Sequence, residues 1–527
     1  MDKDGIQRLL ENNPEYREKL FCRGFLFTDD AVSEEAYPFY GLWRKEQIGR
    51  YALIVSPQLQ YSIASDALAT ILLLGHAYDP FSSISNESEI LTKLLSQRNG
   101  IGDADSCFWR EVNALTGVFT IIMVRGDSVV VIGDASGMQT TFYCVHGGKT
   151  YISSHTNLIG DLLNLEWDSY VKDLTSYCFF PLLGNSLPGD LTQFTEVKRL
   201  IPNHYIQIVS DNAKVVRFFW PQKLLKTPTE IVNEVSRLMQ ANMRLIARKW
   251  KKPAISMTGG CDSKTTLACT KGAYDKFSYF SYISSESEAV DAVAAKQICD
   301  VLGLPHTIYE IADNDNEFKH VSIVKEILNW NTGNIRYSHP NDIRKRIFFS
   351  DTEDFDVEVK SWASEIGRAY YSKRFNGRTQ FGDNPTPRKC TTLYKFFFNN
   401  RRLVRQTDRV FEEYLARYFE RAKENPVEWQ EQFFWEFRMP SWNGLVITGE
   451  HRYSFDITIP YNNRRILELL LSVPIAERIS DQVYKNIRAK MNPEIDQTGI
   501  AVTNLKHTEN RGKAENIYYI LHTHVPF

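Results

Sequence analysis

The residues with the clearest chemical meaning form one short segment, Ser256–Ser263, in which two adjacent glycines are flanked by hydroxyl groups and a carboxylate. A strand-like run precedes the glycines and a helical run follows them. Adjacent glycines let a chain turn sharply, and they leave backbone N–H groups to face an anion beside the positive end of the helix. Thr258 and Ser263 add hydroxyl donors, and Asp262 is placed where Mg²⁺ bridging phosphates would bind. The segment predicts a phosphate cradle; the ordinary alternative is a strand-to-helix turn with a capping aspartate.

The elements that must position this segment alternate between helix and strand. Thr227–Glu230 is a capping box with proline at the first helical position, which predicts the start of a helix. Strand patterns at Lys252–Met257, FSYFSYI and HTIYEI alternate with one helix that ends at Cys269 and another over Val290–Leu302. This alternation is typical of a parallel α/β sheet. Beyond residue 400 the pattern is mostly helical, with amphipathic stretches at Val410–Ala422 and Arg465–Leu471.

The preceding part of the chain, from about residue 40 to residue 220, has a different pattern. Short β-rich runs are separated by Gly, Asp or Asn, and one helical stretch, Ser88–Leu95, interrupts them. Such spacing predicts mostly antiparallel sheet in a two-layer stack with helices outside. We therefore expect two domains, 1–220 and 228–527, joined by the polar connector Pro221–Thr227. The strand-like runs are GRYALIV, GVFTIIMV, DSVVVIGDA, TTFYCV, TYISS and HYIQIV.

Composition restricts the classes of partner. The 527 residues are 43% hydrophobic and carry a formal charge of -2, so no overall positive field favours nucleic acid or an anionic membrane. The longest apolar runs are far too short to cross a membrane, and the first residues lack the apolar core of a signal peptide. The eight cysteines contain no CxxC pair and the eleven histidines no zinc-ligand spacing. These features predict a folded cytoplasmic protein without zinc.

The segment around Asp262 resembles the SGGxDS loop of the PP-loop ATP pyrophosphatases, with Thr258 in place of the first serine. Ser287–His306 and Arg452–Pro474 resemble later segments of the asparagine synthetase and β-lactam synthetase group. The resemblance implies an α/β parallel-sheet domain of the adenine nucleotide α-hydrolase-like type with a helical C-terminal part, and it implies ATP and Mg²⁺ as cofactors. The residues that it assigns to the nucleotide are Ser256, Thr258, Gly259, Gly260, Cys261, Asp262 and Ser263.

The N-terminal half resembles a class II glutamine amidotransferase domain, which implies an α+β sandwich of the Ntn-hydrolase type. The matching segments occur in the family's order. They are Gly75–Asp79, Asn86–Ile90, Leu115–Phe119 and Gly133–Tyr143, and Phe179–Pro202 resembles the connection to the second domain.

This half departs from the family where glutamine would be hydrolysed. Such a glutaminase uses a cysteine at the mature N-terminus, but this sequence begins Met1-Asp2-Lys3 and its first cysteine is Cys22. Leu74 stands where the family has the asparagine that binds the glutamine amide. We therefore expect a glutaminase domain without glutaminase activity, retained as a scaffold, and we expect Cys22 to be a buried inert thiol.

The family's metal and pyrophosphate segment aligns with Val359–Tyr370. Glu365 is retained, whereas Ser364 replaces an aspartate, so the resemblance leaves Asp262 and Glu365 as the expected Mg²⁺ ligands. Lys360 and Arg368 are expected to offer positive charge to the departing pyrophosphate; the alternative is that both are surface charges. Ser361 stands where β-lactam synthetases have a tyrosine, so β-lactam formation is not expected.

Two lysines complete the expected site. Lys485, in Tyr484–Arg488, resembles the family's "K..LR" element with a spacing one residue short, and Lys506 falls where the family has a second lysine. A cation there would stabilise charge as an amine attacks the acyl-adenylate. For Lys506, the alternative is a solvated lysine in a loop.

These features predict an ATP-dependent ligase that activates a carboxylate as an acyl-adenylate, releases pyrophosphate and forms an amide with an amine. The expected partners are a small-molecule or peptide carboxylate and an amine, and a homodimer is compatible with the sequence. Two alternatives stay open: a lasso-type peptide macrolactam cyclase, and an inactive family member that acts by binding alone. The identities of the acid and the amine, and whether they belong to one molecule, are left open by the sequence.

Overall fold

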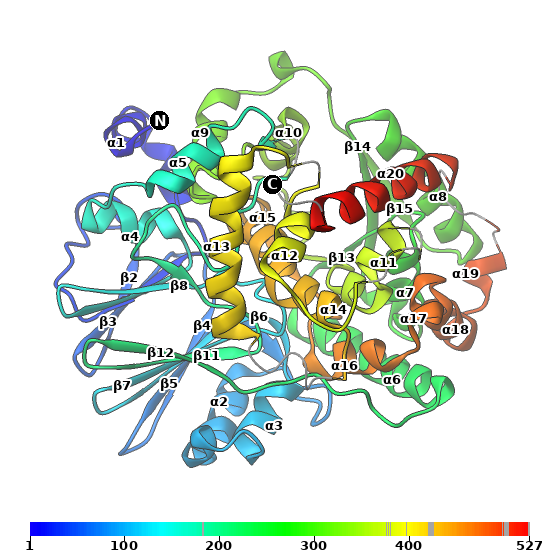
Figure 1. Ribbon diagram of the computed structural model, residues 1–527, viewed down its shortest axis with the longest axis horizontal. Helices are drawn as coiled ribbons and strands as arrows, with labels where there is room; N and C mark the ends of the chain where they lie inside the picture. The colour runs from blue at the N-terminus through cyan, green and yellow to red at the C-terminus, as the bar shows by residue number, and fades with distance from the viewer. Residues whose placement is uncertain are drawn as a thin grey trace.

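The computed structural model of this chain divides into a half built on antiparallel sheets and a half built on a parallel sheet with helices around it (Figure 1). It describes residues 1–181, 184–375, 377, 379, 381–396, 398–419, 426–497, 499 and 505–524, with only the backbone for 505–511.

Two six-stranded antiparallel sheets form the N-terminal half, in the orders β10-β8-β9-β1-β3-β2 and β12-β11-β7-β6-β5-β4. Phe27 and Leu53 of the first sheet share a buried cluster with Leu72 and Ile122 of the second, so the sheets are stacked face to face. The expected two-layer stack is confirmed. The first sheet contains β1 (Phe25–Thr28), β2 (Arg44–Ile48), β3 (Tyr51–Val55), β8 (Phe142–His146), β9 (Lys149–Ser153) and β10 (Lys198–Arg199), and the second contains β4 (Tyr61–Ser65), β5 (Thr70–Tyr78), β6 (Thr116–Arg125), β7 (Ser128–Gly133), β11 (His204–Val209) and β12 (Asn212–Arg217).

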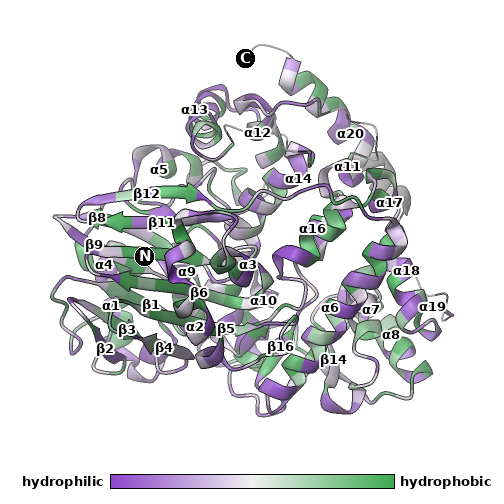
Figure 2. Ribbon diagram, turned by 90° about the horizontal axis from the view of Figure 1, so that it is seen from below, coloured by the Kyte–Doolittle hydropathy of each residue, from purple (hydrophilic) through white to green (hydrophobic). Residues whose placement is uncertain are grey.

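Helices cover the outer faces of both sheets, and Figure 2 shows that strands of the stack, such as β8 and β1, are largely hydrophobic. Leu91 of α2 (Glu87–Ser96) and Trp109 of α3 (Cys107–Ala114) pack on the second sheet. On the first sheet lie α1 (Lys3–Asn12), α4 (Thr156–Leu163) and, from the other half of the chain, α9 (Val321–Asn331). The sequence predicted a single helical stretch in this half, so α3, α4 and α5 (Ser169–Thr175) are corrections; each has eight residues or fewer, too short for a clear period.

The second half contains a five-stranded sheet in the order β15-β14-β13-β16-β17, and every neighbouring pair is parallel. The expected alternation of strand and helix is confirmed from residue 228 to residue 310. β16 and β17 were not predicted because each has only three residues. The elements are α6 (Pro228–Lys249), β13 (Pro253–Ser256), α7 (Cys261–Cys269), β14 (Ser278–Ile283), α8 (Glu286–Val301), β15 (His306–Glu310), α10 (Pro340–Phe348), β16 (Val357–Val359) and β17 (Asp456–Thr458).

Helices make up most of the remaining chain. The predicted stretch Val410–Ala422 falls on α13 (Arg401–Tyr418), which ends earlier, and residues 420–425 lie outside the described part. An uncommon π-helix over Phe434–Gly444 leads directly into α15 (Leu445–Gly449). No helix in the described ranges is long and apolar enough to cross a membrane. The others are α11 (Tyr370–Arg374), α12 (Pro387–Tyr394), α14 (Trp429–Phe433), α16 (Arg464–Ser472), α17 (Ile475–Ile479), α18 (Gln482–Met491), α19 (Glu494–Gln497) and α20 (Leu505–His524).

A buried carboxylate joins the two halves. Asp134, at the end of β7, accepts hydrogen bonds from the backbone of its own turn and from Asn462 Nδ2 at 2.9 Å. Arg464 Nη2 donates to the carbonyl oxygen of Asp134 at 3.1 Å. A Cβ on Gly444 would lie 2.1 Å from the carbonyl oxygen of Gly137, so the π-helix approaches this turn as closely as backbone allows. The halves therefore meet through hydrogen bonds to the turn at Asp134 and through direct backbone packing.

The start of α6 gives a test of the sequence-derived boundary. The Thr227 side chain accepts from the N–H of Glu230, and Glu230 in turn accepts from the N–H of Thr227, so the predicted capping box is confirmed. Thr227→Ala should lower the free energy of unfolding by about 0.5–2 kcal/mol. Thr229→Ala, an exposed position in the same turn, is the matched control. Urea unfolding followed by circular dichroism measures both; equal losses would contradict a capping role.

Candidate functional site

The predicted phosphate cradle lies at the point where the order of the parallel sheet reverses. From β13 the chain continues through β14 and β15 on one side, and it then returns to β16 on the other side of β13. Ligands of open α/β sheets bind outside the carboxyl ends of the strands at such a point. Here the carboxyl ends of β13 and β16 lead into Met257–Gly260 and Lys360–Ser364. The topology therefore brings the two sequence-predicted segments together.

A cavity of about 540 Å³ opens at this edge, a volume in the usual range for small-molecule sites. Its wall carries six carboxylates and three cations, so it is acidic overall. Of the residues predicted for the site, Ser256, Thr258, Asp262, Ser263, Lys360 and Glu365 line it. The sequence did not single out the following site residues: Tyr282, Glu288, Arg336, Asp342, Lys345, Trp362, Trp442, Asn443, Glu450 and His451.

The glycine turn is held together by its own hydroxyl groups. The hydroxyls of Thr258 and Ser263 lie 2.9 Å apart, and Ser263 Oγ also donates to the carbonyl oxygen of Thr258 at 2.9 Å. The expectation that both glycine N–H groups are unobstructed is wrong. The Gly259 N–H donates to Asp291 Oδ1 at 3.2 Å and the Gly260 N–H to Thr258 Oγ1 at 3.2 Å. An anionic oxygen thus already accepts from this turn, although it belongs to a side chain 32 residues away.

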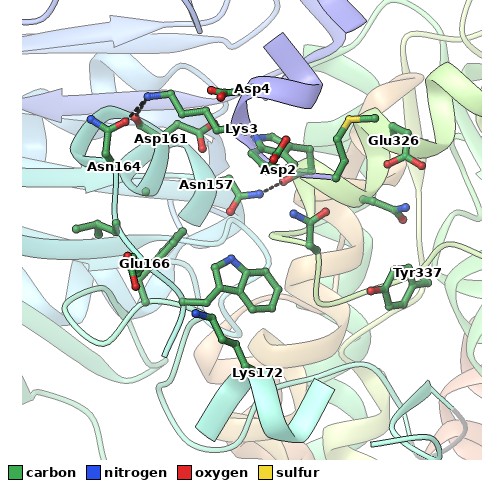
Figure 3. Close-up of a pocket in the computed structure, with 18 of the residues that line it drawn as sticks. Asp2, Lys3, Asp4, Asn157, Asp161, Asn164, Glu166, Lys172, Glu326 and Tyr337 are labelled. Atoms are coloured by element: carbon green, nitrogen blue, oxygen red, sulfur yellow. Dashed lines mark hydrogen bonds between the residues drawn. The ribbon is translucent and has the colours of Figure 1, made fainter. Parts of the chain in front are cut away.

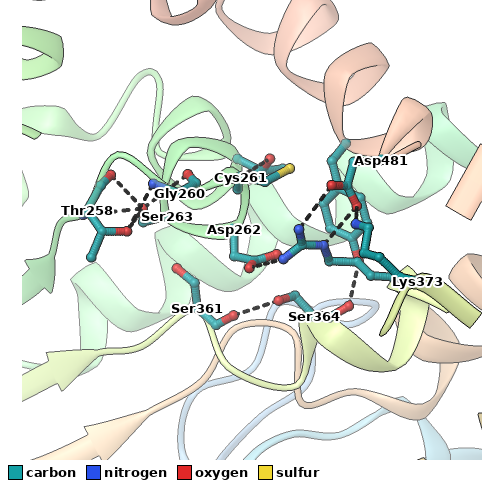
Figure 4. Close-up of polar contacts among 12 residues, drawn as sticks. Thr258, Gly260, Cys261, Asp262, Ser263, Ser361, Ser364, Lys373 and Asp481 are labelled. Atoms are coloured by element: carbon teal, nitrogen blue, oxygen red, sulfur yellow. Dashed lines mark hydrogen bonds and ion pairs between the residues drawn. The ribbon is translucent and has the colours of Figure 1, made fainter. Parts of the chain in front are cut away.

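Asp262 lies beside this turn and is paired with an arginine (Figure 4). One of its oxygens forms an ion pair with Arg368, whose Nε also donates to Asp481 at 2.9 Å. The other oxygen, Oδ1, is buried and has no hydrogen-bond partner. Burial raises the pKa of Asp262, and the charge of Arg368 partly offsets this. Arg368 therefore lies at the site, as expected, but it contacts the carboxylate that was expected to bind the metal.

Glu365 is the second carboxylate of the site. It lies in a 3₁₀ turn, Ser364–Arg368, that is flanked by Ala363 at φ 68° and Ala369 at φ 51°, left-handed values that are strained for alanine. Burial, followed by the charge of Asp262, raises the pKa of Glu365 to about 7. Its Oε2 is buried without a hydrogen-bond partner. Strained backbone thus holds the Glu365 carboxylate near that of Asp262.

These two carboxylates fit a divalent cation. Asp262 Oδ1 and Glu365 Oε2 both lack a partner, and each negative charge disfavours ionisation of the other. Within the described ranges no group of three or more His, Cys, Asp or Glu side chains is arranged for a metal. A Mg²⁺ ion here would take only two protein carboxylates and fill its shell with water and phosphate oxygens, as Mg²⁺ commonly does.

Lys360 is a buried cation and not a surface charge. Its Nζ donates to Glu358 Oε1 at 2.7 Å, and both side chains are less than one tenth exposed. Burial lowers the pKa of Lys360, and Glu358 acts in the opposite direction. The positive charges of this wall are therefore already paired, and an anion would share them with carboxylates.

Three further predicted residues have different outcomes. Cys261 starts α7 and its sulfur accepts from Arg488 Nη1 at 3.2 Å; it does not line the cavity. Lys485 is exposed on α18 and also lies outside the cavity wall, because Tyr484 and Arg488, four residues apart, form the buried face of that helix. The side chain of Lys506 lies outside the described residues. The structure thus brings neither lysine to the cavity.

Cys22 and Leu74, the residues at which the other half departs from the glutaminase pattern, are buried. Cys22 is 2% exposed and Leu74 is fully buried within the stacked sheets. Burial raises the pKa of the Cys22 thiol, which disfavours the reactive thiolate.

A larger cavity of about 900 Å³ lies between α1, α4 and α9 (Figure 3). Asp2, Lys3 and Asp4 reach it from the first helix, and Asn157 and Asp161 face it from α4. It shares no residue with the cavity at the parallel sheet. Since Asp262 and Glu365 line the smaller cavity together with Thr258 and Ser263 of the glycine turn, the smaller one is the candidate site.

No protein-family model and no curated protein matches the chain. The solved structures that are similar to it include two at 10% identity. The allosteric regulatory enzyme of purine biosynthesis matches 46% of this chain and 56% of its own, with a TM-score of 0.24. Glutamine phosphoribosylpyrophosphate amidotransferase from B. subtilis, complexed with ADP and GMP, matches 69% of this chain and 74% of its own, with a TM-score of 0.22. At this similarity the chemistry of the chain rests on its own residues.

The raised pKa of Glu365 predicts a pH-dependent stability. Between pH 4.5 and about 7 the unfolded chain has released this proton while the folded chain still holds it. The free energy of unfolding should therefore fall as pH rises through this window. Glu365→Gln should reduce that fall, so the variant should melt at a higher temperature than the parent at pH 8 and at a similar temperature at pH 4.

Two controls sharpen this measurement. Glu412→Gln, exposed on α13, should leave the difference between the two pH values unchanged. Adding Mg²⁺ at pH 8 should raise the melting temperature of the parent more than that of Glu365→Gln. An equal effect of Glu365→Gln at both pH values would contradict a buried, titrating carboxylate.

Proposed function

We propose that this chain is an ATP-dependent ligase that forms amide bonds. The observation that carries the proposal is a pair of carboxylates, Asp262 and Glu365, each with one buried oxygen that no donor reaches, beside a hydroxyl-lined glycine turn at the reversal point of a parallel sheet. The turn begins α7, so the positive end of the helix dipole would favour a phosphate group there. Thr258 and Ser263 supply hydroxyl donors at the same place.

The residues present suggest the following chemistry. A substrate carboxylate would attack the α-phosphorus of ATP; an O–P bond forms, and the bond to the bridging oxygen breaks to release pyrophosphate. An amine, as the neutral free base, would then attack the acyl carbon: a C–N bond forms, the C–O bond to AMP breaks, and the nitrogen releases a proton to solvent. Mg²⁺ would offset negative charge on the phosphates, and Asp262 and Glu365 would hold it. Lys345 and Lys360 are the buried lysines that line the cavity. Once phosphate replaces their carboxylate partners, they would stabilise the negative charge that develops on the departing pyrophosphate.

A second function is favoured by one contact. Arg368 forms an ion pair with the carboxylate that a metal would need. A chain in which this pair persists would bind nucleotide through the glycine turn without turning it over, and it would act as a binding protein.

Calorimetry of the full chain with ATP and MgCl₂ tests the first step. We expect saturable binding, and Asp262→Asn or Ser263→Ala should weaken it at least about tenfold, equivalent to 1.4 kcal/mol. Asp300→Asn, exposed on α8, is the control and should bind as the parent does. Absence of binding to the parent would overturn the proposal.

A pyrophosphate-release assay with pooled carboxylic acids and amines separates the two functions. Release that depends on Asp262 supports the ligase, whereas ATP binding with no release under any substrate mixture supports the binding protein. The assay on Arg368→Gln adds a direct measure of whether the ion pair limits turnover.

A further inference from the structure

One wall of the cavity carries hydrogen-bond acceptors that no donor reaches. Trp442 and Asn443 line the cavity from the end of the π-helix, Val446 lines it from α15, and Glu450 and His451 follow directly after that helix. π-helical turns occur frequently at functional sites. We call Asn443, Glu450 and His451 the acceptor wall.

Each member of the acceptor wall has a buried atom without a hydrogen-bond partner. These atoms are Asn443 Oδ1, Glu450 Oε1 and His451 Nδ1. Asn443 is 6% exposed and Glu450 is 1% exposed, so bulk water does not supply the missing hydrogen bonds. Leaving such a group unpaired costs free energy, about 1–3 kcal/mol for each neutral group and more for a charged one. Three unpaired groups in one wall therefore point to a ligand that supplies donors.

The negative charge of the acceptor wall is that of Glu450, and one of its two oxygens has no partner. Arg336 Nε and Ser338 Oγ donate to Glu450 Oε2 at 2.9 and 2.8 Å, and neither reaches Oε1. Burial, and then nearby positive charge, lowers the pKa of His451 well below its usual value, so the imidazole is neutral. His451 Nε2 lies 4.0 Å from Glu450 Oε1, which is too far for a hydrogen bond.

Four cations surround His451, and three of them are engaged by carboxylates, whereas Arg346 donates to the carbonyl oxygen of His451 at 3.4 Å and forms no ion pair within the described residues. Arg336 contacts Glu450 and Asp342, and Lys345 contacts Glu288 and Asp342. Lys360 contacts Glu358, which does not line the cavity. Six carboxylates against three cations leave the cavity with an excess of negative charge. At the wall itself, the attraction for a positively charged ligand comes from the unpaired oxygen of Glu450.

The combination of acceptors selects an ammonium group. An ammonium has three N–H donors and no acceptor, which matches one carboxylate oxygen, one amide oxygen and one imidazole nitrogen. Mg²⁺ prefers an octahedron of oxygen ligands and suits the Asp262 and Glu365 pair better. The rings of Trp362 and Trp442 line the same cavity and offer apolar surface to the carbon skeleton that carries the ammonium.

We infer that the acceptor wall is a subsite for an organic ammonium, through which the cavity takes the amine-bearing substrate of the proposed ligase. The inference rests on the proposed function for the role of that amine. The binding itself depends only on the wall, so it can be tested without nucleotide.

Calorimetric titration of the full chain with benzylammonium at pH 7 is the direct test, with benzyl alcohol as the neutral probe of similar shape. We expect saturable binding of benzylammonium, no binding of benzyl alcohol, and weaker binding as the pH rises through the pKa of the amine. Glu450→Gln keeps the acceptor for Arg336 and removes the charge, so it should weaken benzylammonium at least about tenfold.

Two further variants guard against a folding defect. Asn443→Leu removes one acceptor without touching the Arg336 pair, and it should weaken benzylammonium by about three- to tenfold. Glu468→Gln changes a buried glutamate that pairs with Arg465 away from the cavity, and it should bind as the parent does.

Two outcomes would overturn the inference. One is the absence of benzylammonium binding to the parent. Binding to folded Glu450→Gln and Asn443→Leu with the same affinity as to the parent would count equally against it. The other is binding of adenosine, sensitive to Glu450→Gln, without binding of benzylammonium, which would make the wall a pocket for the base. If benzylammonium binds and ATP does not, the subsite stands and the proposed ligase function fails.

Discussion

The architecture depends on the buried contact between the turn at Asp134 and the segment Asn462–Arg464. A carboxylate without solvent must be satisfied by fixed donors, and here those donors come from both halves of the chain. The contact fixes the segment that runs from β17 into α16 against the stacked sheets. β17 is hydrogen-bonded to β16, so the carboxyl end of β16, and with it Glu365, is held by packing that begins in the other half. The N-terminal half therefore supplies contacts that hold one side of the cavity in place.

Electrostatic balance explains the form of the site. Asp262 and Glu365 face the same cavity and disfavour each other's charge, and Arg368 offsets part of that repulsion. The arrangement resembles a metal site in which an arginine holds one ligand, since the guanidinium leaves Asp262 Oδ1 free. On the opposite side, Arg336 leaves Glu450 Oε1 free in the same way. The cavity thus presents two negative positions, each held in place by an arginine.

The sequence predicted the features that are local in the chain. The capping box at Thr227, the strand before the glycine turn and the helix after it follow from spacing and residue type over a few positions. The sequence did not predict that Asp291 would occupy the N–H of Gly259, because that contact joins residues 32 positions apart. Lys485 was expected at the site because of its neighbours, but a helix turns by about 100° per residue and places it away from the buried Tyr484 and Arg488. The acceptor wall was missed because its chemistry depends on which atoms lack partners, and a sequence does not show this.

The π-helix between Phe434 and Gly444 also affects how this region could vary. A π-turn holds one more residue than an α-turn, so removing one residue from this segment would bring it closer to an ordinary helix, although Pro440 would still lack an N–H to donate. Such a deletion would rotate the residues on one side of it relative to those on the other. Trp435, which donates to the carbonyl oxygen of Ala135, would then lose its alignment with Asn443 and Glu450. A shortened relative could keep the fold and still present a different set of side chains to the cavity.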